Sequence, residues 1–273
     1  MKTITFIGTG NMATAIINGM LGAGTPADKI TVYDKMTDKA ALFGEKGAKV
    51  AASLPDAVNA SETVLLAIKP QNFAEALTEL RESGVDYKNK TFITIAAGIS
   101  TEAIEKWLGC ELAVIRVMPN TPLMIGKGTT ALCRNSRVSD SDFADAKSIF
   151  ANSGMTMVID EAQMNTVICV NGSSPAYFYH FIDAMVQSAK AQGLGLDERT
   201  ILEAVCSTVI GSAQMLLDSG KTAGELVRAV TSPKGTTEQA MNVFYGADVS
   251  GIIDKAMRAC TSRAEEMSKE FGK

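Results

Sequence analysis

The first 120 residues alternate short apolar runs with amphipathic stretches. Apolar runs of strand length occur at residues 4–7, 30–33, 63–68, 91–96 and 112–117, and the run at 63–68 is unbroken. Continuous rather than alternating apolar residues are typical of strands buried on both faces, as in a parallel sheet. A helical pattern over 73–81, and a Ser/Thr-capped helix starting near residue 100, lie between these runs. The order predicts strand–helix–strand crossovers and an α/β fold with a Rossmann-like, doubly wound parallel sheet.

Beyond residue 161 strand patterns nearly vanish and helical patterns take over. Helices are predicted at 163–170, 176–192, 199–218, 222–230, 236–245 and 249–271. We therefore expect a dinucleotide-binding domain over residues 1–160 and an all-α domain over 161–273. Several of these helices are apolar on more than one face, which is typical of helices buried between neighbours or subunits. An intertwined homodimer is the expected assembly, with a well-packed monomer as the alternative.

A glycine turn follows the first predicted strand. Gly8, Gly10 and Ala13 form the pattern G-x-G-x-x-A, directly before an apolar helix. The first glycine permits a sharp turn, the second lets a pyrophosphate approach the backbone, and the small Ala13 permits close helix–strand packing. The helix N-terminus offers free N–H groups to phosphates. An ordinary strand–turn–helix is the alternative, and we favour a dinucleotide contacted by Ile7, Gly8, Thr9, Gly10, Asn11 and Met12.

An acidic residue, Asp34, ends the second predicted strand. A carboxylate at this point accepts hydrogen bonds from the ribose hydroxyls of NAD(H) and repels the 2′-phosphate of NADP(H). The neighbouring Lys35 can offset that repulsion, so the sequence leaves the choice between NADPH and NADH open. A plain strand-end turn is the alternative.

Three further segments follow predicted strands, where doubly wound sheets bind ligands. They are the stretches AIKP, AAGI and RVMPNTP. Prolines on either side of Asn120 fix the direction of its side chain. The residues predicted here to bind the cofactor are Ala67, Ile68, Lys69, Pro70, Ala97 and Asn120.

Composition and charge exclude several classes of protein. A net charge of −4 and a pI near 5.2 argue against nucleic acid or an anionic membrane as partner. No run of 18 apolar residues exists, so no membrane span is expected, and a strand at the very start leaves no room for a signal peptide. Five scattered cysteines are expected to be free thiols in the cytoplasm. The single His180 cannot build a metal site, so none is predicted.

Two glycine–serine stretches precede helices in the second half, at 172–177 and 231–237. In the second, Thr236 and Gln239 have the spacing of a capping box. The hydroxyls of Thr236 and Thr237, together with free N–H groups, would form a small anion pocket suited to a carboxylate. Simple capping is the alternative.

Seven segments in order along the chain resemble the pyrroline-5-carboxylate reductase family. They are FIGTGNMA, AIKPQ, AAGIS, RVMPNTP, NGSSPAY, GELVRAV and TSPKGTT. The resemblance implies reduction of 1-pyrroline-5-carboxylate to L-proline by NADPH or NADH, the last step of proline biosynthesis. It also implies an all-α dimerisation domain, a homodimer or higher oligomer, and a site completed by helices of the partner subunit.

A protonated cyclic imine is already electrophilic, so the protein needs mainly to align it and hold its carboxylate. On this hypothesis Thr237 is the catalytic residue and bonds to the ring nitrogen. The residues expected to bind substrate are Glu161, Ser232, Gly235, Thr236 and Thr237; for Glu161 a first-turn helix charge is an equal alternative. Two residues depart from the family pattern: Lys234 replaces a usual glycine, and Asp34 is unusual among NADPH-preferring members.

Two other functions remain as alternatives. A β-hydroxyacid dehydrogenase shares the predicted layout, but it needs a catalytic lysine on the first long helix of the second domain, and none precedes Lys190 there. A non-catalytic NAD(P)-sensing protein is the other, and the substrate-side segments argue against it.

Overall fold

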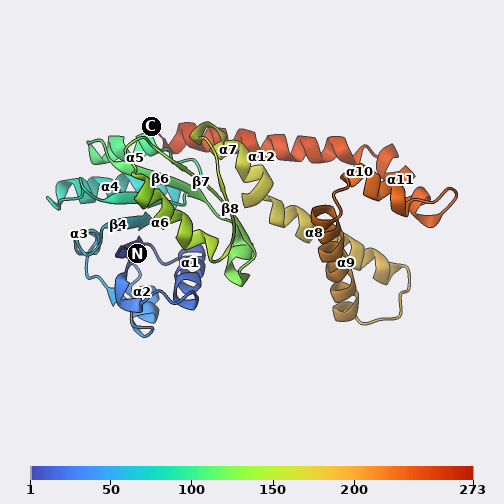
Figure 1. The fold of residues 1–273 in the computed structure, drawn as a ribbon, viewed down its shortest axis with the longest axis horizontal. Helices are drawn as coiled ribbons and strands as arrows, with labels where there is room; N and C mark the ends of the chain where they lie inside the picture. Colours follow the sequence, from blue (N-terminus) through green and yellow to red (C-terminus); the bar gives the residue numbers. More distant parts are fainter. Residues whose placement is uncertain (1, 273) are drawn as a thin grey trace. The chain divides into compact units, whose positions relative to one another are not determined.

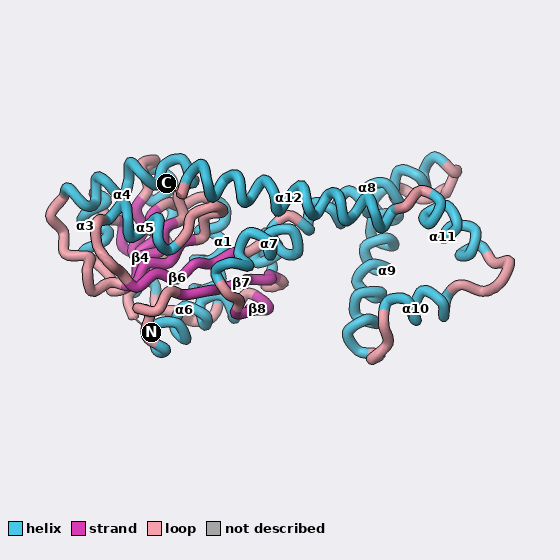
Figure 2. Tube along the Cα trace, turned by 90° about the horizontal axis from the view of Figure 1, so that it is seen from above, coloured by secondary structure: helices cyan, strands magenta, loops and turns pink. Residues whose placement is uncertain are grey.

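The computed structural model describes residues 2–272, which form two compact units. One contains residues up to 173 together with those from 259 onward, and the other contains residues 174–258. Figure 2 shows strands in the first unit and only helices and loops in the second. The predicted domain boundary at residue 160 stays a prediction.

The first unit is built on one sheet of eight strands (Figure 1). The strands are β1 (Ile4–Ile7), β2 (Ile30–Tyr33), β3 (Lys49–Val50), β4 (Thr63–Leu66), β5 (Thr91–Thr94), β6 (Ala113–Met118), β7 (Gly128–Arg134) and β8 (Gly154–Val158). Their order is β3-β2-β1-β4-β5-β6-β7-β8. The first six follow the order of a dinucleotide-binding sheet, which reverses direction between β1 and β4. The doubly wound prediction is confirmed.

The sheet is mixed: the strands predicted from the sequence are parallel to one another, and one later pair is antiparallel. Strands β1 to β6 are mutually parallel, but β7 runs antiparallel to β6. The connection between them is a short 3₁₀ turn, η3 (Thr121–Ile125). A parallel connection needs a dozen or more residues, usually with a helix, and this segment is too short for one. Strands β7 and β8 were not predicted individually from the sequence.

Helices cover both faces of this sheet. Ile4 and Phe6 of β1 belong to a buried cluster with α1 (Asn11–Gly22), α2 (Thr37–Gly44) and α6 (Asp140–Ala151). Ile7 belongs to the opposite cluster, with α3 (Leu54–Asn59), α4 (Phe73–Glu82) and α5 (Thr101–Leu108). Side chains alternate across a strand, so one apolar run supplies both cores. Both faces are therefore buried, as the apolar runs predicted.

The second unit is helical. It contains α8 (Ser174–Ala191), α9 (Glu198–Asp218), α10 (Ala223–Val230), α11 (Thr236–Gly246) and the start of α12 (Val249–Phe271). Among its described residues, Val186 and Ile201 are the only buried hydrophobic side chains, whereas many large ones are exposed. A unit with so small a core depends on burial against another surface. His180 is exposed in the single chain.

Helix α9 alone, among the described residues, is long and apolar enough by composition to span a membrane, with a mean hydropathy of 1.5. The expectation that no segment spans a membrane stays a prediction. Only 6% of that window is buried in the single chain. One such helix is weak evidence for a membrane, because apolar interface helices meet the same criterion.

The last helix, α12, ends in the first unit. A side chain on Gly98 would lie 3.0 Å from the backbone of Met267, so the two segments pack closely. The side-chain amide of Asn165 donates to the hydroxyl of Ser268 at 3.0 Å. The C-terminal residues therefore complete the same unit that the N-terminal strand begins.

The five cysteines are all free thiols. Cys133 and Cys169 are buried, and the other three are partly buried. Burial, with a further contribution from the Glu161 carboxylate, raises the pKa of the Cys133 thiol to about 12. A thiol this far from ionisation is chemically inert at neutral pH.

Candidate dinucleotide and substrate site

The glycine turn has the geometry that a dinucleotide requires. Gly8 has a φ of +96°, and a Cβ there would lie 2.7 Å from the carbonyl oxygen of Ala67. The turn after β1 is thus pressed against the end of β4, and glycine is required. A Cβ on Gly10 would meet nothing within 4 Å, so this face of the backbone is open. Ala13 is buried against the sheet, as predicted.

Helix α1 begins directly after this turn. Its N-cap is Gly10, which offers no side-chain hydrogen bond to the first N–H groups. These donors and the helix dipole favour an anion at this end of the helix. The open backbone at Gly10 and the uncapped helix therefore fit a pyrophosphate.

Asp34, which directly follows β2, is hydrogen-bonded to the glycine turn. Its Oδ2 accepts hydrogen bonds from the backbone N–H of Thr9 at 2.7 Å and from the Thr9 hydroxyl at 2.8 Å. Its Oδ1 accepts a hydrogen bond from the backbone N–H of Met36 at 2.9 Å. Partial burial alone would raise the pKa of Asp34, but these hydrogen bonds outweigh it and hold the pKa below its ordinary value. The carboxylate is thus ionised and fixed in place.

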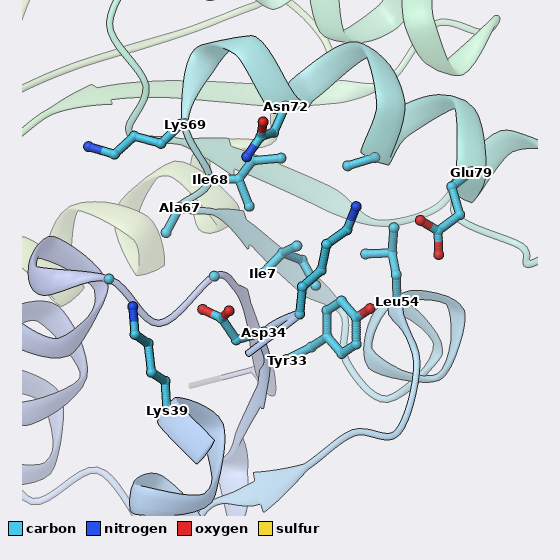
Figure 3. Close-up of a pocket in the computed structure, with 14 residues that line it drawn as sticks. Ile7, Tyr33, Asp34, Lys39, Leu54, Ala67, Ile68, Lys69, Asn72 and Glu79 are labelled. Atoms are coloured by element: carbon cyan, nitrogen blue, oxygen red, sulfur yellow. The ribbon is translucent and has the colours of Figure 1, made fainter. Parts of the chain in front are cut away.

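A groove of about 240 Å³ opens where the sheet order reverses (Figure 3). Eight predicted cofactor residues line it: Ile7, Gly8, Gly10, Asp34, Lys35, Ala67, Ile68 and Lys69. Six further lining residues were not predicted: Tyr33, Lys39, Leu54, Asn72, Ala76 and Glu79. Of these, Tyr33 was detectable as the last residue of the second strand. The others depend on how α2, α3 and α4 pack beside the sheet, which a single sequence does not reveal.

Other predicted cofactor residues lie outside the lining of this groove. Thr9 is buried beneath the turn, and Asn11 and Met12 begin α1. Pro70 starts the 3₁₀ turn η2 (Pro70–Asn72), and Ala97 packs against a separate buried cluster. Their contact with the cofactor stays a prediction.

Asn120 is buried, and both ends of its side-chain amide are already hydrogen-bonded. Its Nδ2 donates to the carbonyl oxygen of Asn171 at 3.2 Å, and its Oδ1 accepts from the Thr129 backbone N–H at 2.8 Å. The sequence correctly predicted a fixed side chain. Contact of Asn120 with the cofactor stays a prediction.

Both carboxylate oxygens of Glu161 are hydrogen-bonded to residues of the first unit. Its two oxygens accept hydrogen bonds from the backbone N–H of Thr101 at 2.8 Å and the Thr101 hydroxyl at 2.7 Å. It also forms an ion pair, at 3.4 Å, with the buried guanidinium of Arg116. Burial lowers the pKa of Arg116, and the carboxylate partly offsets that effect. A structural role at the start of α5 is established; contact with substrate stays a prediction.

The loop before α11 is tightly folded. Lys234 has a φ of 61°, in the left-handed region where glycine is favoured, and a Cβ on Gly235 would lie 2.9 Å from both Ser232 oxygens. The predicted capping box is wrong: Gly235 is the N-cap, Thr236 is the first helical residue, and no side chain caps the helix. Among the described residues, no hydrogen bond involves the hydroxyls of Thr236 or Thr237. These donors and the helix N-terminus suit an anion.

A sheet of this order, with a glycine turn and an uncapped helix at its switch point, defines the dinucleotide-binding class of α/β proteins. A pyrroline-5-carboxylate reductase of Haemophilus influenzae is 39% identical over 272 residues, covering 99% of both chains. The chain belongs to the pyrroline-5-carboxylate reductase family, which is a family of NAD(P)H-dependent oxidoreductases.

Further comparisons agree with this assignment. Residues 161–267 match the family described as pyrroline-5-carboxylate reductase dimerisation, and residues 3–98 match NADP oxidoreductase coenzyme F420-dependent. The structure of a pyrroline-5-carboxylate reductase from Coxiella burnetii has a TM-score of 0.87 and 34% identity, covering 98% of each chain. A Plasmodium falciparum pyrroline carboxylate reductase with NADP bound has the same TM-score at 23% identity, which supports the fold alone. The chain therefore carries a dimerisation domain.

Proposed function

We propose that this chain reduces 1-pyrroline-5-carboxylate to L-proline with NADPH or NADH, the last step of proline biosynthesis. The supporting observation is family membership over the whole chain, which includes both the glycine-turn unit and the loop before α11. The open backbone at Gly10 and the uncapped N-terminus of α1 fit the pyrophosphate of such a cofactor. The reduced nicotinamide, when bound, supplies the hydride.

The loop before α11 is proposed to hold the substrate. The carboxylate would accept hydrogen bonds from Ser232, Gly235 and Thr236, through hydroxyl and backbone donors at the helix N-terminus. The hydroxyl of Thr237 would bond to the ring nitrogen and fix the orientation of the imine. Since a protonated cyclic imine is already electrophilic, alignment is the main contribution required of these residues.

The assembly is proposed to be a homodimer or larger homo-oligomer formed through the C-terminal helices. The exposed apolar side chains of α8, α9 and α11 support this, because they have no cover in the single chain. The acidic balance of the chain speaks against nucleic acid and anionic membranes as partners. We expect the enzyme to act in the cytoplasm.

An assay of the purified chain tests the proposal. The protein is incubated with 1-pyrroline-5-carboxylate and each reduced cofactor in turn, while nicotinamide absorbance and L-proline are both measured. We expect loss of absorbance matched by L-proline. Folded, oligomeric protein that binds a cofactor but forms no L-proline would contradict the proposal. Turnover of a β-hydroxyacid instead would favour the dehydrogenase alternative.

A further inference from the structure

The groove that contains Asp34 is lined by charges of both signs. Two carboxylates line it, those of Asp34 and Glu79, and Glu75 lies outside the lining, paired with Lys35. Three ammonium groups line the same groove, those of Lys35, Lys39 and Lys69. Among the described residues, no arginine lines the groove. In Figure 3 both Glu79 and Lys69 lie away from Asp34, so the labelled charges at this corner are those of Asp34 and Lys39.

Neither Lys35 nor Lys39 is free of an acidic neighbour. The Nζ of Lys35 lies 2.6 Å from the Oε1 of Glu75, and the charge of Glu79 acts on Lys35 as well. Lys39 extends toward Asp34 in Figure 3, and its charge favours the ionised carboxylate. Lys69 follows β4, and its side chain extends away from Asp34 (Figure 3). A phosphate at this corner would have to compete with these carboxylates for the two lysines.

Rotation of the Asp34 carboxylate away from its present position would break its hydrogen bonds. Three donors already hold its carboxylate: the N–H and hydroxyl of Thr9 and the N–H of Met36. A rotation would leave the partly buried Thr9 N–H without its partner and release the glycine turn. A carboxylate has about four acceptor positions, so one remains, on Oδ1. That position suits a hydroxyl donor.

We infer that Asp34 makes the groove select NADH over NADPH, by accepting a hydrogen bond from the 2′-hydroxyl of the adenosine ribose and repelling a 2′-phosphate. The inference rests on the proposed function only in taking a nicotinamide dinucleotide as the ligand. A 2′-phosphate would bring nearly two negative charges up to the fixed, ionised carboxylate of Asp34. The same carboxylate both holds the turn and selects the cofactor.

Equilibrium binding tests this inference without substrate. The dissociation constants of NADH and NADPH are measured by nicotinamide fluorescence on the full chain. We expect NADH to bind the wild-type protein roughly tenfold more tightly than NADPH, the scale of a repulsion between close charges near a protein surface. Higher salt should narrow this ratio, because it screens the repulsion.

Variants distinguish the effect of the negative charge of Asp34 from the effect of its hydrogen bonds to the glycine turn. Asp34→Ser should shift the ratio of the two dissociation constants toward NADPH by roughly tenfold. If that variant fails to fold, the double variant Glu75→Gln, Glu79→Gln leaves the contacts of Thr9 intact and should shift the ratio in the same direction by about twofold to threefold. As a matched control, Thr9→Val removes one hydrogen bond but keeps the carboxylate. It should weaken both cofactors alike and leave the ratio unchanged.

Two results would overturn the inference: NADPH binding to the wild type at least as tightly as NADH, or a ratio that neither Asp34→Ser nor the glutamine pair changes. These outcomes are distinct from failure of the proposed function. Production of L-proline with an NADPH preference removes the inference and keeps the function. Selective NADH binding without production of L-proline would support the inference and contradict the proposed function.

Discussion

The side chain of Asn120 is hydrogen-bonded to the backbone of Asn171, and the side chain of Asn171 is hydrogen-bonded to β6 and β7. We call this set of hydrogen bonds the Asn120–Asn171 brace. The side chain of Asn120 donates to the backbone carbonyl of Asn171, and the side chain of Asn171 donates to the carbonyl oxygens of Met118 at 2.7 Å and Thr129 at 3.1 Å. Asn171 lies in a π-helical turn, η5 (Ile168–Gly172). Such turns interrupt the normal helical bonding and are often found at functional sites. The brace fixes the segment between β6 and β7.

Asn171→Ala should destabilise the protein. The substitution leaves the buried carbonyls of Met118 and Thr129 without this donor, at a cost of about 2–3 kcal/mol in the free energy of unfolding. Urea unfolding measures the change. Asn59→Ala, at an exposed asparagine at the end of α3, is the control and should change little. Equal stability of the two variants would contradict a structural role for the brace.

Glu161→Gln separates two roles for that residue. If its role is to hold Thr101 and neutralise Arg116, the variant should lose about 1–3 kcal/mol of stability, because a buried guanidinium loses its counter-charge while the carboxylate site is partly exposed. The KM for substrate should then change little. A higher KM at unchanged stability would instead place Glu161 at the substrate. Urea unfolding and steady-state kinetics together decide.

Thr237→Ala should lower kcat/KM by roughly 10- to 100-fold, the effect of removing one hydrogen bond to a charged group. The affinity for NADH or NADPH should not change, since the residue is assigned to the substrate alone. Thr237→Ser keeps the hydroxyl and should retain most activity. Unchanged kinetics in the alanine variant would remove Thr237 from its assigned role.

Asp34 should contribute to stability in a pH-dependent way. Its pKa is lower in the folded protein than its ordinary value of 3.8, so the unfolded chain binds the proton more tightly. The stabilisation is present above the unfolded pKa and is lost as the pH falls through the folded pKa. Asp34→Asn should therefore be less stable than wild type by about 1–2 kcal/mol at neutral pH, with the difference shrinking below about pH 4.

Urea unfolding at a series of pH values measures this difference. Asp28→Asn, at an exposed carboxylate with no hydrogen bond among the described residues, is the matched control. A difference between wild type and Asp34→Asn that stays constant from neutral to acid pH would show that the Thr9 and Met36 bonds do not depend on ionisation.

Much of the fold was predictable because local patterns determine it. The strand at Ile30–Tyr33 and the helix at Val249–Phe271 lie where periodicity placed them. The antiparallel β7 was missed, since its direction depends on the length of a turn rather than on its own apolar pattern. The capping box at Thr236 failed for a related reason: the positive φ of Lys234 shifts the helix start by one residue, and no composition rule reveals that conformation.

In the candidate site, too, some features were predictable from local sequence and others were not. The glycine turn and Asp34 were predictable, because a motif specifies them. The hydrogen-bond partners of Asp34 and Glu161 were not predictable. Thr9 lies 25 positions from Asp34 along the chain, and Thr101 lies 60 positions from Glu161. Long-range hydrogen bonds decide whether a carboxylate is free to meet a ligand, and they arise only when the chain has folded.

The close packing of Met267 on Gly98 has a consequence for synthesis in the cell. The residues from 259 onward are synthesised after the helical unit of residues 174–258, yet they complete the unit that contains β1. A nascent chain therefore exposes the buried surface around Met118 and Met164 until this segment has been made. Removal of the segment that starts at residue 259 should consequently impair cofactor binding, even though the nucleotide motif lies more than 240 positions away along the chain.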